Sequence, residues 1–283
     1  MITLPEFPNR VFKNWDEAHA ALKEHEKRLI GLKCSQIYKS IDKLQGFSIT
    51  PFLDKSLVSA KSHVPTWMKE GNVYPVINTT LYRDSHKDVH FNELWKRSIK
   101  NNVGKLYYVE GHELMTKSII AWPEDVKAFT AMVPWSFLGK SYEGETQALI
   151  YEIPDAAIKH EGARDVIDNK RDMQNSVRMQ YVKMSLALNS DSSEWKENKE
   201  LYDSRIDLVA NKDVIEAEDN YFWAVDEAKI FKEGSMVIAG SNDVTPIIYE
   251  DPAKSTSSDT DPPEGTQLSD AQKAENAFYN NLI

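Results

Sequence analysis

The longest strand-like run of the chain, residues 177–188, is immediately preceded by a serine, Ser176. Apolar residues dominate this run, which is typical of a β-strand. The segment before it, 155–174, is rich in charged residues and fits either a helix or a charged loop. Ser176 is therefore expected at an element boundary, where a base can reach its hydroxyl group.

Further strand-like runs, rich in β-branched and aromatic residues, lie at 73–82, 106–109, 146–153, 221–230 and 235–239. The segment 126–133 fits a strand or a helix, and its pattern does not separate the two. Helix-like segments at 91–100 and 193–218 lie between the strands. Short strands with inserted helices predict an α+β fold, a small closed β-barrel decorated by helices, because closing the barrel removes exposed sheet edges.

The N-terminal region, 1–72, is expected to hold an irregular arm followed by one long helix over 15–45. Its apolar residues recur at helical spacing: Ala18, Ala21, Leu22, Leu29, Leu32, Ile37, Ile41 and Leu44. Asn14 or Asp16 can cap the start of this helix, and Gly46 follows its end. The helix either packs on the main domain with a solvated charged face, or mediates dimerisation or docking.

The main domain is expected over 73–248, where the strand-like runs lie. After Ile248 the composition changes to Ser, Thr, Asp and Pro. Such a segment has too few apolar residues to form a core, so 249–283 is expected to be a disordered acidic tail. Residues 271–282 could form a short helix against a partner.

Composition excludes several functional classes. The formal net charge is −10, which gives no electrostatic footprint for nucleic acid. The single cysteine, Cys34, excludes an internal disulfide, and no apolar run is long enough to span a bilayer. The N-terminus lacks the pattern of a secretory signal. We therefore expect a soluble protein of a reducing cytoplasm with no nucleic-acid or membrane partner.

Three segments carry residues suited to hydrolysis by a serine nucleophile. His112 follows a short strand-like run and Gly111, so its imidazole could project from a rim, and imidazole titrates near neutral pH. Ser176 precedes the longest run, and Glu233 lies between two strand-like runs. From their types alone, these residues also fit an ordinary surface or core histidine, a capping serine and a surface glutamate.

In this order, the segments 106–112, 175–184 and 232–237 resemble the prohead (capsid maturation) proteases of tailed bacteriophages. The likeness extends over about 73–248. It includes further blocks at Asn78-Thr79-Thr80, 84–90, 209–212, 221–225 and 240–246. The resemblance implies the triad His112, Ser176 and Glu233. It leaves Glu227 as an alternative third member and Asp226 as a weaker one.

The family carries a Ser-x-Gly-hydrophobic pattern at the nucleophile, whereas this chain has Arg178 in place of the glycine. Arg178 could supply positive charge to an oxyanion, or it could face solvent. The resemblance implies a herpesvirus assemblin-like barrel and a serine endopeptidase without cofactor or metal. It further implies cleavage of scaffold and major capsid protein inside the prohead in the host cytoplasm, with self-cleavage and activation as a homodimer.

Two other functions remain open. Asp84, His86, Asp88 and His90 resemble a zinc or manganese site, to which Glu110 or His112 could add a ligand in a metal-dependent hydrolase. Alternatively, the chain could be an inactive scaffold or internal head protein with a protease-like fold, which the Arg178 substitution favours. Cys34 lies in the expected helix without a partner motif and is expected to pack rather than react.

Overall fold

The structure is a computed structural model that describes residues 1–38 and 65–249. The chain divides into two units, Met1–Glu250 and Asp251–Ile283, and all described residues belong to the first. The tail expected over 249–283, apart from its first residue, and the last part of the expected N-terminal helix therefore lie outside the described residues. No helix in the described ranges is long and apolar enough to cross a membrane.

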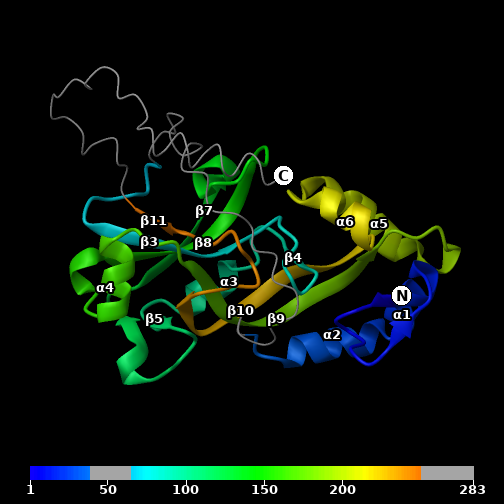
Figure 1. The fold of residues 1–283 in the computed structure, drawn as a ribbon, viewed down its shortest axis with the longest axis horizontal. Helices are drawn as coiled ribbons and strands as arrows, with labels where there is room; N and C mark the ends of the chain where they lie inside the picture. Colours follow the sequence, from blue (N-terminus) through cyan, green and yellow to red (C-terminus); the bar gives the residue numbers. More distant parts are fainter. Residues whose placement is uncertain (39–64, 250–283) are drawn as a thin grey trace, which may run out of the picture. The chain divides into compact units, whose positions relative to one another are not determined.

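The main sheet is organised around β10 (Tyr221–Val237), a strand of 17 residues. One edge of β10 pairs antiparallel with β9 (Gln174–Leu188), and the two strands run side by side in Figure 1. The opposite edge pairs in parallel with two short strands, and a third short strand extends the sheet. These are β4 (Asp88–His90), β5 (Tyr107–Glu110) and β6 (Ile119–Ala121). β10 therefore connects segments that are far apart in the sequence.

A second sheet has the order β11-β3-β8-β7 and is antiparallel throughout. Its strands are β3 (Asn72–Thr79), β7 (Lys127–Pro134), β8 (Glu145–Pro154) and β11 (Ile247–Ile248). The N-terminal arm forms a small pair, β1 (Ile2–Thr3) and β2 (Val11–Phe12). The α+β class is confirmed. The closed barrel is not found, because the described strands pair into separate sheets of two, five and four strands.

β10 passes close to the second sheet at Gly234. A Cβ atom at this position would lie 2.8 Å from Cε2 of Tyr151 in β8 and 2.9 Å from Cδ1 of Ile77 in β3. Both neighbours are buried in the main apolar core. Only glycine allows this approach, and the residues on either side of it, Glu233 and Ser235, are fully buried.

In the described parts of the chain, six α-helices lie outside the sheets: α1 (Trp15–Glu24), α2 (Glu26–Ser35), α3 (Lys96–Asn101), α4 (Glu161–Asp168), α5 (Lys196–Arg205) and α6 (Lys212–Glu218). The prediction of a single helix from residue 15 is wrong at His25, whose backbone leaves the helical region at φ −103° and ψ 8°. The break redirects the chain, so that α2 lies against β9. Of the two candidate caps, Asn14 is the one used: its Oδ1 accepts a hydrogen bond from the Glu17 N–H at 2.9 Å.

Two strand boundaries differ from the sequence-based prediction. β9 begins at Gln174, so Ser176 lies inside the strand and not before it. The run 221–230 and the first part of the run 235–239 belong to the single strand β10, which ends at Val237 and continues through an irregularity with Lys232 at φ 74°. The ambiguous segment 126–133 is the strand β7.

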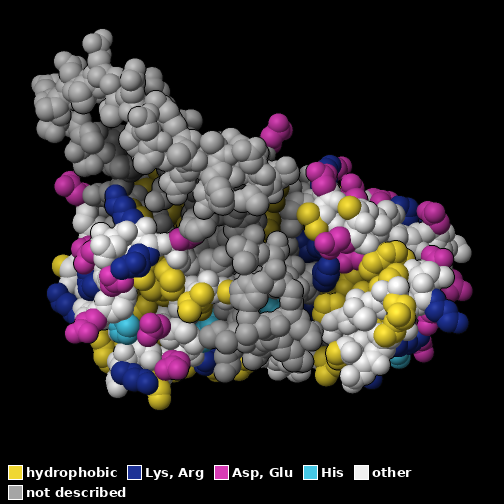
Figure 2. All heavy atoms as spheres, in the orientation of Figure 1, with side chains coloured by type: hydrophobic (Ala, Val, Ile, Leu, Met, Phe, Trp, Pro, Cys, Tyr) yellow, Lys and Arg dark blue, Asp and Glu magenta, His cyan; other side chains and the backbone are white. Residues whose placement is uncertain are grey.

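On the face drawn in Figure 2, acidic and basic side chains are interspersed between patches of hydrophobic side chains.

Candidate active site

His112 follows β5 in an unusual backbone conformation. Gly111 and His112 both have positive φ, 59° and 60°. For a residue with a Cβ atom, this conformation costs roughly 1–2 kcal/mol and persists only where surrounding contacts hold it. Those contacts are present: the His112 N–H donates to Ser235 Oγ at 2.7 Å, and its C=O accepts from Nη2 of Arg178 at 2.8 Å.

The imidazole of His112 is paired with Glu233. Its Nδ1–H donates to Glu233 Oε1 at 2.8 Å, and both side chains are almost fully buried. This contact selects the tautomer with the proton on Nδ1, so Nε2 is the ring nitrogen that can take a proton. A carboxylate in this position also stabilises the imidazolium that forms when Nε2 is protonated.

Ser176 lies in β9 directly opposite Ser235 of β10. Residues opposite each other in an antiparallel pair project from the same face of the sheet. Because Ser235 also binds the His112 backbone, Ser176 lies in the same part of the sheet as the histidine–glutamate pair. Of the three residues that the resemblance indicated, His112 and Glu233 are in direct contact, whereas Ser176 is related to them by its strand position and is only 8% exposed.

The strand position of Ser176 is fixed through the residue before it. Asn175 Oδ1 accepts from the Tyr108 hydroxyl at 2.6 Å, and its Nδ2 donates to the Thr245 carbonyl at 2.8 Å. Thr245 Oγ1 returns a hydrogen bond to the Asn175 carbonyl at 2.6 Å. The buried polar contacts of Asn175 therefore connect β9 to β5 and to the segment before β11.

The alternative third members lie elsewhere. Glu227 pairs with Arg97 at 3.3 Å, and Asp226 pairs with Arg205 at 2.6 Å. Glu233 is the carboxylate in contact with His112. Of the two alternatives for Arg178, the one in which it faces solvent is wrong, because its side chain is 14% exposed and its Nε lies 3.2 Å from Glu233 Oε1.

Sequence reasoning missed Ser235, Asn175 and Thr245. Ser235 is two residues after Glu233, and residues two apart in a strand share a face. The sequence could therefore have predicted that Ser235 lies beside Glu233. Asn175 and Thr245 gave no such indication, because their contact joins segments 70 positions apart.

The acidic and histidine-rich segment after β3 is a hydrogen-bonded network and not a metal site. Within residues 1–38 and 65–249, no group of three or more His, Cys, Asp or Glu side chains is placed to hold a metal ion. Asp88 accepts from Lys33 Nζ at 2.5 Å and from the Tyr181 hydroxyl at 2.7 Å. His90 Nδ1 lies 3.0 Å from Asn78 Nδ2, and burial lowers the pKa of His90.

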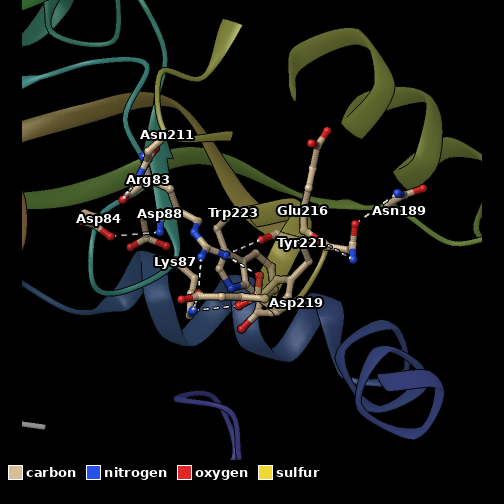
Figure 3. A network of polar contacts seen from close by, with 12 residues as sticks. Arg83, Asp84, Lys87, Asp88, Asn189, Asn211, Glu216, Asp219, Tyr221 and Trp223 are labelled. Carbon is tan, nitrogen blue, oxygen red and sulfur yellow. Dashed lines mark hydrogen bonds and ion pairs between the residues drawn. The ribbon is translucent and has the colours of Figure 1, made fainter. Parts of the chain in front are cut away.

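Figure 3 shows how the neighbouring charges are matched. Arg83 pairs with Asp219 and with Glu218, and Lys87 Nζ lies 2.7 Å from Asp219 Oδ2. Asp84 Oδ1 accepts the N–H of Asp88 at 3.0 Å. This network attaches the loop between β3 and β4 to the end of α6, which is a structural role.

Two hollows of the described surface lie away from His112. One is lined by residues that include Asp125 and Glu152, and the other by residues that include Trp15 and Trp195. Neither holds a nucleophile paired with a base, so the geometry around His112 remains the best candidate for chemistry. Comparison of the chain with protein-family models, curated proteins and solved structures finds no match.

Proposed function

We propose that the chain is a serine endopeptidase in which Ser176 is the nucleophile, His112 the general base and Glu233 the residue that orients the base. The observation that carries this proposal is the buried 2.8 Å contact between His112 Nδ1 and Glu233 Oε1, next to the strand position of Ser176. A histidine held by a carboxylate beside a hydroxyl is the arrangement that serine hydrolases require.

In the proposed reaction, Ser176 Oγ attacks the peptide carbonyl carbon while its proton moves to Nε2 of His112. The C–N bond then breaks, and the imidazolium gives this proton to the leaving amine. Water attacks the resulting ester through the same base, which releases the acid product and restores the Ser176 hydroxyl. Glu233 stabilises the imidazolium in both stages.

The resemblance to phage prohead proteases supports a narrower proposal. The substrates are the scaffold and major capsid protein of a tailed phage, cleaved inside the prohead in the host cytoplasm, with self-cleavage and a homodimer as the active form. The same proposal includes an assemblin-like arrangement of the strands, which is a finer statement of the fold than the α+β class. The support is the order of the segments around His112, Ser176 and Glu233 in the sequence.

Intact-mass spectrometry tests the reaction directly. The wild-type protein, Ser176→Ala and the control Ser204→Ala, an exposed serine of α5, are incubated alone and with the scaffold and capsid proteins of the same phage. Discrete fragments from the wild type and the control, but not from Ser176→Ala, support the proposal. Identical fragments from all three proteins exclude Ser176 as the nucleophile. Loss of those fragments on adding a chelator would favour a metal-dependent hydrolase.

One observation favours a second candidate, an inactive scaffold or internal head protein with a protease-like fold. Ser176 is 8% exposed and does not line either of the two hollows described above, whereas an endopeptidase must admit an extended peptide to its nucleophile. Labelling with a fluorophosphonate probe separates the two candidates. Covalent labelling of Ser176 contradicts the inactive scaffold, and no labelling together with no cleavage by the folded wild type supports it.

A further inference from the structure

Arg178 projects from β9 into the pair formed by His112 and Glu233. Its Nε lies 3.2 Å from Glu233 Oε1, at an angle that makes the contact an ion pair and not a hydrogen bond. Its Nη2 donates to the His112 carbonyl at 2.8 Å. A single guanidinium group therefore contacts both residues, with a side chain that is only 14% exposed.

The charge of Glu233 explains why a cation is needed here. The Glu233 side chain is fully buried, and its Oε2 has no hydrogen-bond partner among the described residues. Burying a carboxylate away from water is costly unless a cation or hydrogen-bond donors compensate its charge. When His112 is neutral it offers Glu233 one N–H. Among the described lysines and arginines, Arg178 is the one that forms an ion pair with Glu233.

The backbone of His112 explains the second contact. Its left-handed conformation, φ 60°, places the imidazole against Glu233. Ser235 binds the N–H of this residue and Arg178 binds its C=O. Loss of either partner removes a hydrogen bond from the main chain of a buried residue and allows the histidine to relax towards a more favourable φ.

We propose that Arg178 is a positioning residue of the hydrolytic site, which compensates the charge of the buried Glu233 carboxylate and fixes His112 in the conformation that points its imidazole at that carboxylate. This inference rests on the proposed serine hydrolase function. It gives a role to the position where the resembled family carries glycine. The guanidinium group does not touch the reacting atoms in this role, because it acts through Glu233 and His112.

Lysine cannot replace Arg178 fully. A guanidinium group presents several N–H donors in a rigid fork, so it can contact a carboxylate and a carbonyl at the same time, whereas an ammonium is a point charge. Arg178→Lys should therefore keep part of the function, and Arg178→Ala should lose both contacts.

The experiment measures the rate at which a fluorophosphonate probe labels Ser176 in the wild type, Arg178→Lys and Arg178→Ala. The matched control is Arg171→Ala, which removes an exposed arginine paired with Asp165 at 2.7 Å. We expect labelling of Arg178→Ala to slow about 100-fold, because small displacements of a catalytic base have effects of this size. Arg178→Lys should recover part of the rate, added guanidinium ion should restore part of the Arg178→Ala rate, and Arg171→Ala should match the wild type.

The outcomes separate the two proposals. If the folded wild type is not labelled, the serine hydrolase function fails. If the wild type is labelled and Arg178→Ala reacts at the same rate, only the role of Arg178 fails. The role of Arg178 is also overturned if labelling is lost in Arg178→Ala, is equally lost in Arg178→Lys and is not restored to Arg178→Ala by added guanidinium ion, because this pattern indicates general structural damage. Should Arg178→Ala not fold, an unchanged rate in the folded Arg178→Lys protein would count against the inference, and a reduced rate would support it.

Discussion

Ser176 and Ser235 face each other across β9 and β10, and Ser235 Oγ accepts the main-chain N–H of His112 at 2.7 Å. One serine of the central strand thus connects the strand of the candidate nucleophile with the loop of the candidate base. Ser235 Oγ also donates to the Val109 carbonyl at 3.1 Å in β5. We therefore expect the position of His112 relative to Ser176 to depend on a residue that takes no part in the proposed chemistry.

Ser235→Ala should destabilise the protein and slow hydrolysis. The change removes the hydrogen bond from the His112 N–H to Ser235 Oγ in a buried position, which costs about 1–3 kcal/mol. Urea unfolding measures the stability, and fluorophosphonate labelling of Ser176 measures the reactivity, with Ser204→Ala as the exposed control. Normal labelling of Ser235→Ala would show that this contact does not set the geometry of His112.

Glu233→Gln should lower the cleavage rate by roughly 10²- to 10⁴-fold, the range found when the group that orients a catalytic or ligating histidine is lost. Glutamine keeps the size of the side chain and removes the charge that stabilises the imidazolium. The control is Glu227→Gln on the same strand, since Glu227 pairs with the exposed Arg97 at 3.3 Å and such surface pairs contribute about 0–1 kcal/mol. A greater loss of activity in Glu227→Gln would assign the third triad position to Glu227.

Gly234→Ala tests the close approach of β10 to the second sheet. The added methyl group would lie 2.8 Å from Tyr151 Cε2 and 2.9 Å from Ile77 Cδ1, so we expect a destabilisation of about 1–3 kcal/mol by overpacking, with loss of labelling at Ser176. In Gly31→Ala the new methyl group meets nothing within 4 Å inside α2. Alanine there should stabilise the helix by about 0.5–1 kcal/mol. Equal midpoints of urea unfolding for the two variants would contradict this packing argument.

The choice between Glu227 and Glu233 shows where sequence reasoning stops. The two residues are six positions apart, so strict alternation would place both on one face of a regular strand. The strand is irregular between them: the pairing with β9 shifts between Ile230 and Gly234, and Lys232 has φ 74°. Nothing in the local composition predicts that shift, which places Glu233 against His112.

The strand-like runs were predictable because β-branched and aromatic residues cluster there, as in β3 and β8. The short strands β4 and β6 were not, since three residues carry too little pattern. His25 interrupts the expected N-terminal helix without a glycine or proline, so its sequence gave no stop signal. The partners of Arg178 could not be predicted either, because both contacts join segments more than 50 positions apart.

Stability should fall between pH 7 and about pH 5.5. Burial lowers the pKa of His90 and of His19. In the unfolded chain both titrate near pH 6.5, so below that pH the unfolded state binds more protons than the folded state and the free energy of unfolding decreases. His86 opposes this trend: burial lowers its pKa, but the hydrogen bond and charge of Asp84 outweigh burial and raise it.

Two substitutions with opposite expected effects test this pH dependence. His90→Asn keeps an acceptor for Asn78 and removes the titrating ring, so the decrease in stability between pH 7 and 5.5 should become smaller, by at most about 1.4 kcal/mol per pH unit. His86→Asn removes the opposing group, so the decrease should become larger. Urea unfolding at each pH measures both slopes. Because His90→Asn also removes buried contacts, its stability at pH 7 should be lower than that of the wild type, and only the slope is diagnostic. A slope that is unchanged in His90→Asn, or reduced in His86→Asn, would show that other groups control the loss of stability in this pH range.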